Sequence, residues 1–287
     1  MPGGAGQRHA EQELVGSPAV VLTRLGTGRP TVLLHGGGPG CTSGNDFAAV
    51  LDLLTPERAL LLVDLPQFGQ AEAVRITGPV WDFHAARIAD LLDTLDLRHA
   101  DIVGQSFGGC VALRLAALRP ELVRRVVATG SQPTPYARPD GPGAEIGRQV
   151  RERYYRDGGP SRAKMRELIA GLEWHDPRRI PAQLVDRRYE ASILPGPLAF
   201  GVDHGGRGRP QDLSGQLAEV RAKVLLIWGE HDPFTDPGYA RQLASRLPDA
   251  QVEVVPAAAH HPQSEHPDRY AALVQQFLST PDSSEQL

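Results

Sequence analysis

The residues Gly104-Gln105-Ser106-Phe107-Gly108-Gly109 contain the pattern G-x-S-x-G between a predicted strand and a predicted helix. In that context a serine lies on a sharp, strained turn that exposes its hydroxyl group, and only glycine lets the neighbouring backbones pass closely enough. The chemistry of such a serine is nucleophilic attack on a carbonyl carbon. The alternative is a glycine-rich strand-to-helix turn with an incidental serine, which the flanking strand and helix disfavour.

A serine is a weak nucleophile until a base removes its proton, so an acid and a histidine should follow it in the chain. The predicted strand Val224–Trp228 runs into a loop that contains Asp232, the candidate acid. The predicted strand Val252–Pro256 runs into a loop that contains His260, the candidate base. The rival acids are Glu230 and Asp236, which we interpret as loop or capping residues, and the rival bases are His261 and His266.

A second glycine-rich segment, His35-Gly36-Gly37-Gly38-Pro39-Gly40, follows the predicted strand Thr31–His35. A loop of this type supplies a backbone N–H group to the oxyanion that forms during acyl transfer. We predict that the N–H groups of Gly37 and Phe107 form this oxyanion hole. A phosphate-binding loop is the alternative, but the Lys-Ser/Thr ending of a P-loop is missing.

A sheet whose strands end at a common edge would bring these residues together. The chain alternates short apolar runs with amphipathic helical stretches, as such a fold requires. The runs are apolar throughout, as in strands that are buried on both faces. The sequence therefore predicts an α/β fold with a mostly parallel, twisted sheet and helices on both faces. Val20–Leu25 is predicted as an antiparallel edge strand. The other expected strands are Ala59–Asp64, Ala100–Gly104 and Arg125–Thr129, and the expected helices of the core are Trp81–Leu95, Phe107–Leu118, Pro237–Leu247 and Pro267–Leu278.

One segment, residues 131–215, interrupts this alternation because it contains no convincing strand and several helical patches. A loop of this length without structure is improbable in a compact domain, so we expect a helical lid. Its predicted helices are Ala144–Tyr155, Arg162–Leu172 and Pro181–Ile193. The expected organisation is a disordered N-terminus (1–10), a core in two parts (11–130 and 216–279) around the lid, and a disordered tail (280–287).

The composition excludes several classes of function. The 287 residues carry a net charge of −4 with no long run of one sign, which argues against binding to nucleic acid or to membrane surfaces. The two cysteines, Cys41 and Cys110, form neither a disulfide framework nor a metal motif, and no histidine cluster has zinc spacing. We expect no metal and no cofactor. No secretory signal is recognisable, so the expected location is the cytoplasm; whether the protein forms a homodimer stays open.

The motif HGGGPG, the serine turn, VLLIWGEHDPF and AHHPQSEHPDRY together resemble the meta-cleavage-product hydrolases, a branch of the α/β-hydrolases. These enzymes cleave carbon–carbon bonds in ring-opened aromatic compounds. The resemblance spans Val20–Thr129 and Arg221–Leu278 and implies a triad of Ser106, Asp232 and His260.

The resemblance also implies contacts with the substrate. Arg188, in Arg188-Tyr189-Glu190, matches a lid arginine that grips the carboxylate end of the substrate, although an exposed helix arginine is the alternative. Gln105 stands where the family usually has Asn, and His261 where it usually has Trp; Asn45 or Asp46 takes the place of a further Asn. These positions shape the pocket, so Gly38, Gln105, Arg188 and His261 are the predicted substrate-binding residues.

The substrate is thus a small organic molecule, and we expect a carbon–carbon bond in a keto- or dienoate compound to be hydrolysed. An esterase or lactonase acting on an aromatic or polyketide-like metabolite is the alternative, and a non-catalytic binder of small molecules is a third. Inward-facing aromatic side chains of the lid would favour an aromatic substrate. The candidates are Tyr136, Tyr154, Tyr155, Trp174 and Phe200.

Overall fold

The computed structural model describes residues 11–135, 143–201 and 203–281. An eight-stranded sheet has the order β1-β2-β4-β3-β6-β7-β9-β10, and it is parallel from β4 to β10. The strands β1 and β2 are antiparallel to their neighbours. The bounds are β1 Gln12–Val15, β2 Val20–Leu25, β3 Arg29–Leu34, β4 Arg58–Asp64, β6 Ala100–Gln105, β7 Val123–Thr129, β9 Lys223–Gly229 and β10 Ala250–Val255.

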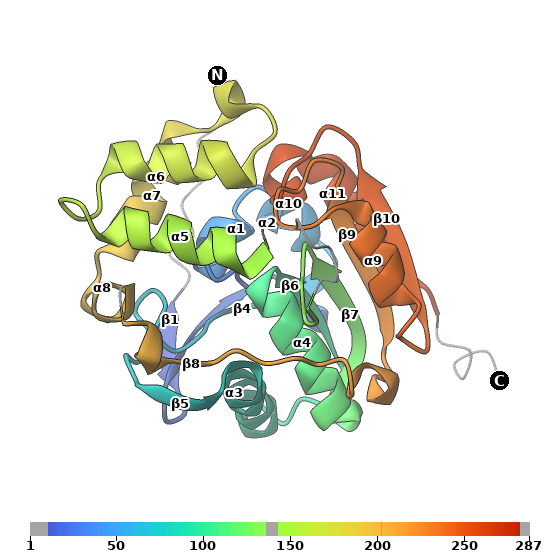
Figure 1. The fold of residues 1–287 in the computed structure, drawn as a ribbon. Coiled ribbons are helices and arrows are strands. Elements are labelled where there is room, and N and C mark those ends of the chain that lie inside the picture. Colours follow the sequence, from blue (N-terminus) through green and yellow to red (C-terminus); the bar gives the residue numbers. More distant parts are fainter. Residues whose placement is uncertain (1–10, 136–142, 202, 282–287) are drawn as a thin grey trace, which may run out of the picture.

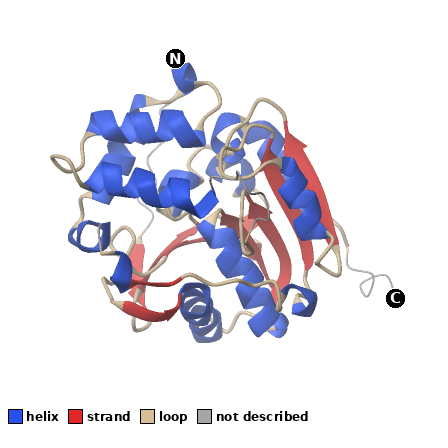
Figure 2. Ribbon diagram, viewed as in Figure 1, coloured by secondary structure: helices blue, strands red, loops and turns tan. Residues whose placement is uncertain are grey.

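Helices cover both faces of the sheet (Figures 1 and 2), which confirms the predicted α/β architecture. Successive side chains of β3 point to opposite faces of the sheet, and both faces are buried. Val32 and Leu34 belong to one core cluster and Leu33 to the other, which explains the uninterrupted apolar run. The first cluster includes residues of α3, α4 and α9, and the second includes residues of α2 and α11. The bounds of the core helices are α1 Ser43–Asp46, α2 Leu51–Leu54, α3 Val80–Thr94, α4 Phe107–Leu118, α9 Pro237–Ala244, α10 Pro262–Glu265 and α11 Pro267–Ser279.

Between β7 and β9 the chain forms a helical insertion, residues 143–201, with its own cluster of buried side chains. Figure 1 shows its helices α5, α6 and α7 above the end of the sheet. The predicted helix Arg162–Leu172 ends early, because after Leu168 the chain continues as a π-helical turn. The bounds are α5 Gly143–Tyr155, α6 Arg162–Leu168, the π-turn Ile169–Glu173, α7 Ala182–Ser192 and α8 Pro195–Gly201.

Some predictions about strands were wrong. Val20–Leu25 is a strand with the predicted bounds, but β1 pairs with it and takes the edge. A small second sheet joins β5 (Ile76–Pro79) to β8 (Arg207–Arg209), which lies inside the segment where no strand was expected. These strands have three or four residues, too few for a period to be recognised. The predicted disordered N-terminus (1–10) lies outside the described residues, and so do residues 282–287 of the predicted tail (280–287).

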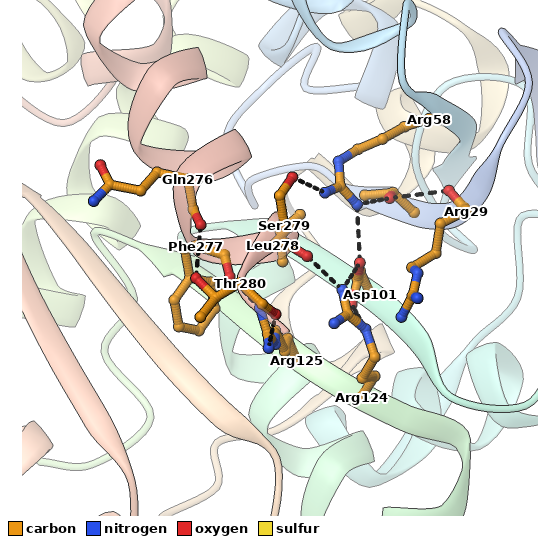
Figure 3. A network of polar contacts seen from close by, with 11 residues as sticks. Arg29, Arg58, Asp101, Arg124, Arg125, Gln276, Phe277, Leu278, Ser279 and Thr280 are labelled. Carbon is orange, nitrogen blue, oxygen red and sulfur yellow. Dashed lines mark hydrogen bonds and ion pairs between the residues drawn. The ribbon is translucent and has the colours of Figure 1, made fainter. Parts of the chain in front are cut away.

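At the edge of the sheet where the parallel strands begin, buried Asp101 accepts hydrogen bonds from two arginines (Figure 3). Arg58 Nη1 lies 2.9 Å from Asp101 Oδ2, and Arg124 Nη2 lies 2.6 Å from the same oxygen. Arg124 and Arg125 also donate to backbone carbonyl groups at the end of α11, which have no partner within the helix. The network fixes the last core helix at the edge opposite to the loops that follow the strands.

Of the helices in the described ranges, none is both long and apolar enough to cross a membrane.

Candidate active site

Ser106 lies on the sharp turn between β6 and α4, with φ 49° and ψ −107°. Such a conformation is strained for a residue other than glycine, and it persists only when the surroundings impose it. A Cβ atom on Gly104 would lie 2.4 Å from the Gly109 nitrogen, and one on Gly108 would lie 2.3 Å from the Leu34 carbonyl oxygen. The two glycines of the motif are therefore required by close backbone contacts, as the sequence indicated.

Asp232 and His260 are buried and joined by a short hydrogen bond, 2.7 Å between Asp232 Oδ2 and His260 Nδ1. The second oxygen of Asp232 accepts from the Phe234 N–H at 2.9 Å, which holds the carboxylate in place. Burial by itself disfavours a charged imidazole, but the charge and hydrogen bond of Asp232 outweigh burial and raise the pKa of His260. With Nδ1 donating to Asp232, Nε2 is the nitrogen that can accept a proton.

The rival acid and base residues have other partners. Asp236 caps α9 by accepting from the Gly238 N–H, and Glu230 accepts from the Ala257 N–H. The His266 ring bonds to the Ala257 carbonyl group on the surface. The geometry thus favours Asp232 and His260 as the pair.

The glycine-rich loop after β3 is held from both sides. The Leu65 N–H donates to His35 Nε2 at 3.0 Å, so His35 Nδ1 donates to the Gly36 carbonyl group. The Gly36 N–H donates to Asp46 Oδ2 at 2.7 Å. A Cβ atom on Gly37 would lie 3.2 Å from Phe107 Cβ, so the two predicted oxyanion-hole residues are packed against each other.

A cavity of about 320 Å³ lies between these loops and the helical insertion. Six of the predicted site residues line it: Gly37, Gly38, Ser106, Phe107, His260 and His261. The walls are mainly apolar, and their aromatic side chains come from the core and not from the insertion. The wall also includes Cys41, Trp81, Gly147, Arg148, Val150, Arg151, Leu168, Leu172, Glu173 and Phe234.

Gln105 has a different position from the one expected for a substrate contact. It is fully buried and does not line the cavity; its Nε2 donates to the His260 carbonyl oxygen at 2.8 Å. The residue before the nucleophile therefore holds the backbone of the base. The same loop is held by the His261 N–H, which donates to the Glu173 carbonyl oxygen at 3.1 Å, and by Glu265, which accepts from the Ala259 N–H.

Arg188 is neither exposed nor part of the cavity wall, which corrects both interpretations of it. Its guanidinium is fully buried and makes two bonds of 2.9 Å to the carboxylate of Glu173. Its Nε donates to the Pro39 carbonyl group at 3.0 Å. A grip on a substrate carboxylate does not fit this geometry, because the protein's own carboxylate occupies the face of the guanidinium that makes paired bonds.

Asn45 and Asp46 do not line the cavity either. Asn45 donates to the Gly40 carbonyl group, and Asp46 lies between Gly36 and Arg188. The aromatic side chains of the insertion also face elsewhere. Tyr154 and Trp174 are buried in the core of the insertion, Phe200 is buried outside the main cavity, Tyr155 lines a smaller cavity, and Tyr136 lies outside the described residues.

Among the charged residues of the cavity wall that were not singled out from the sequence are Glu173 and Arg151. Glu173 ends the π-turn and faces His261, with 3.8 Å between Glu173 Oε2 and His261 Nε2. Arg151, on α5, donates from Nη2 to the Gly37 carbonyl group at 2.7 Å. Helical periodicity does not reveal Glu173, because the π-turn interrupts the period. It does not distinguish Arg151 either, because α5 carries several arginines.

Comparison with known proteins gives the context of this site. A family profile described as alpha/beta hydrolase fold matches residues 30–267. A 2-hydroxymuconate semialdehyde hydrolase from Pseudomonas sp. (strain CF600) is 33% identical over 268 residues, which cover 90% of each chain.

Solved structures agree on the fold. A meta-cleavage product hydrolase from Pseudomonas fluorescens IP01, complexed with acetates, superposes with a TM-score of 0.79 at 25% identity, covering 91% of this chain and 94% of the other. A thermophilic esterase from Thermogutta terrifontis has a TM-score of 0.74 at 22% identity, covering 94% and 98%. The fold is therefore shared by enzymes named for different bonds.

Proposed function

Because the chain belongs to the α/β-hydrolase family, we propose that this hydrolase cleaves a carbon–carbon bond in a ring-opened aromatic keto-dienoate, with Ser106 as nucleophile. The observation that carries the proposal is the joint placement of Ser106 and His260 on one cavity wall, with Asp232 bonded to the far side of the imidazole. The curated relative named above supports the choice of substrate class. The location in the cytoplasm and the oligomeric state stay predictions.

The proposed reaction begins with a proton transfer from Ser106 to His260 Nε2 as the serine oxygen attacks the carbonyl carbon. Asp232 fixes the imidazole tautomer and stabilises its positive charge. The oxyanion accepts hydrogen bonds from the N–H groups of Gly37 and Phe107; the latter is at the start of α4, where N–H groups have no partner within the helix. The loss of one such donor costs on the order of 10²–10³ in rate.

In a keto-dienoate, a proton first moves from the enol oxygen to carbon, which gives the keto form. After serine attack the carbon–carbon bond breaks. Its electron pair is delocalised through the remaining double bond onto the 2-keto group and receives the proton of His260. The acyl-enzyme is then hydrolysed by water, with His260 again as base. An ester or lactone would need the same serine, histidine and oxyanion hole without the first step.

Ester or lactone hydrolysis is the second candidate, and the Glu173–Arg188 pair favours it. A dienoate carries a carboxylate, and the arginine that the resemblance assigns to it is already bound by Glu173. A neutral ester needs no such partner.

Two measurements separate these possibilities. We expect a fluorophosphonate to label Ser106 at neutral pH and Ser106→Ala to abolish labelling; an unlabelled wild-type protein would contradict hydrolase chemistry at this serine. We then expect purified enzyme to bleach a coloured meta-cleavage dienoate. Turnover of p-nitrophenyl esters without bleaching would exclude the carbon–carbon reaction and leave the esterase.

A further inference from the structure

Besides Arg188, two further arginines border the glycine-rich loop. Arg151 lines the main cavity and also a smaller adjoining one of about 10 Å³, room for about one water molecule or one carboxylate oxygen. Arg207 lines the smaller cavity, with its guanidinium over the Phe68 ring, 5.2 Å from the centroid. Gly37, Gly38 and Pro39 of the glycine-rich loop line both cavities.

In the described part of the chain, neither of these guanidinium groups is paired with a carboxylate. Arg151 donates to the Gly37 carbonyl oxygen, and Arg207 donates to the Phe200 carbonyl oxygen. Other arginines near the cavity are neutralised: Arg148 by Glu145 and Glu152, and Arg188 by Glu173. Burial lowers the pKa of Arg151, and burial together with the charge of Arg151 lowers that of Arg207. The Arg151 end of the cavity therefore carries uncompensated positive charge.

The Glu173 end has the opposite character. Burial opposes the ionisation of Glu173, but Arg188 and His261 hold its pKa down at about 2, so it is a carboxylate at neutral pH. Burial lowers the pKa of His261, although the charge of Glu173 opposes this effect. With Asp46 also within 3.8 Å of Arg188, two carboxylates surround one guanidinium. An anionic substrate group is repelled at Glu173 and attracted at Arg151.

We propose that Arg151, with Arg207 behind it, is an anion subsite that binds the carboxylate of the substrate. The proposal deepens the proposed hydrolase function, on which it rests, and moves carboxylate recognition from Arg188 to α5. One Nη of Arg151 is bonded to the Gly37 carbonyl group, and the rest of its planar fork remains available for paired bonds to a carboxylate. Because the same bond joins Arg151 to the oxyanion loop, the anion is held at a fixed distance from the reacting carbonyl group.

The test uses two esters that differ in one charge: the p-nitrophenyl monoester of adipic acid and its methyl ester, in which the free carboxylate is blocked. The same number of carbon atoms separates carboxylate and reacting carbonyl group in adipate and in a 2-hydroxy-6-oxo-dienoate. We expect the wild type to prefer the carboxylate ester. Arg151→Met should lower kcat/KM for that ester about 10- to 100-fold, mainly through KM, and change the methyl ester much less.

Matched variants separate binding from positioning. Arg151→Lys keeps the charge and should restore part of the preference, and Arg207→Gln should weaken it without touching the oxyanion loop. Arg153→Gln, an exposed arginine on the same helix, should leave the ratio of the two esters unchanged. An equal loss on both esters in Arg151→Met would show that Arg151 only positions Gly37, and it would overturn the proposal, as would a wild type without preference.

The outcome is independent of the bond that the enzyme cleaves in nature. If no dienoate is bleached but the carboxylate ester is preferred through Arg151, the carbon–carbon function fails and the subsite stands. If neither ester is turned over, calorimetry with monomethyl adipate on Ser106→Ala decides: we expect binding that Ser106→Ala/Arg151→Met weakens about 10-fold or more. The subsite would be overturned if Ser106→Ala did not bind monomethyl adipate, or if Ser106→Ala/Arg151→Met bound it as tightly as Ser106→Ala.

Discussion

Glu173 and Arg188 form a buried ion pair with two parallel bonds of 2.9 Å, at the place where the helical insertion meets the glycine-rich loop. Glu173 ends the π-turn, Arg188 lies on α7, and the third bond of Arg188 reaches the Pro39 carbonyl group. The pair thus connects two parts of the insertion with the loop that supplies the oxyanion hole.

Arg188→Ala should destabilise the protein by about 3–5 kcal/mol, because it leaves the Glu173 carboxylate buried without a partner. Urea unfolding measures the loss. The double variant Glu173→Leu/Arg188→Met, which removes both charges, should recover most of it. A variant with unchanged stability that loses only carboxylate-bearing substrates would place Arg188 in contact with substrate and contradict the structure.

Acid should weaken this ion pair over a defined range. The pKa of Glu173 lies at about 2 in the folded protein and near 4.5 in the unfolded chain. Its contribution to stability is therefore fully present above about pH 4.5 and is lost as the pH falls towards 2. The difference in unfolding free energy between wild type and Glu173→Gln should shrink across this range. A difference that stays constant between pH 5 and the lowest pH tolerated would contradict the assignment.

The pH profile of catalysis should report the His260–Asp232 pair. His260 acts as base only when neutral, and Asp232 raises its pKa, so kcat/KM should rise with pH through an apparent pKa above 6.5. Asp232→Asn removes the charge, so this pKa should fall, while kcat drops by about 10⁴-fold because the wrong tautomer is favoured. An unshifted profile in the variant would show that another group titrates.

Gly130 gives a steric test of the same pair. A Cβ atom there would lie 2.9 Å from His260 Nδ1 and 3.1 Å from Asp232 Oδ2, so Gly130→Ala should displace the imidazole and cost about 10²-fold in kcat. Gly16→Ala is the control, because Gly16 also has a positive φ but no atom within 4 Å of the added Cβ. Gly16→Ala should lose only the small amount of stability that a positive φ costs. Equal activities of the two variants would argue against the predicted base.

The catalytic core could be predicted from the sequence because its geometry is local. Glycines around Ser106 are required by backbone contacts, and parallel strands bring the residues that follow them to one edge of the sheet, so the loops of Asp232 and His260 could be placed from strand ends alone. The bounds of Phe107–Leu118 match the helix as found.

The pocket wall was less predictable, because it depends on pairings between distant residues. Nothing in the local pattern shows that Glu173 binds Arg188, since the π-turn that places Glu173 departs from helical periodicity. The side chains of Gln105 and Arg188 were expected to contact the substrate because of the family resemblance. Gln105 replaces the Asn that the family usually has, and Arg188 matches its lid arginine. Their roles depend on the partners that this chain gives them, the His260 carbonyl group and Glu173.

The ties around Glu173 also determine how molecules can enter and leave. The backbone of Glu173 is bonded to His261, and its side chain is linked through Arg188 to Pro39, so this side of the cavity is closed by contacts whose rupture would disturb both the base and the oxyanion hole. Another part of the wall is formed by α5, where Arg148 lines the cavity with a half-exposed side chain. We therefore expect substrates to enter past α5, the part of the wall that carries Arg151.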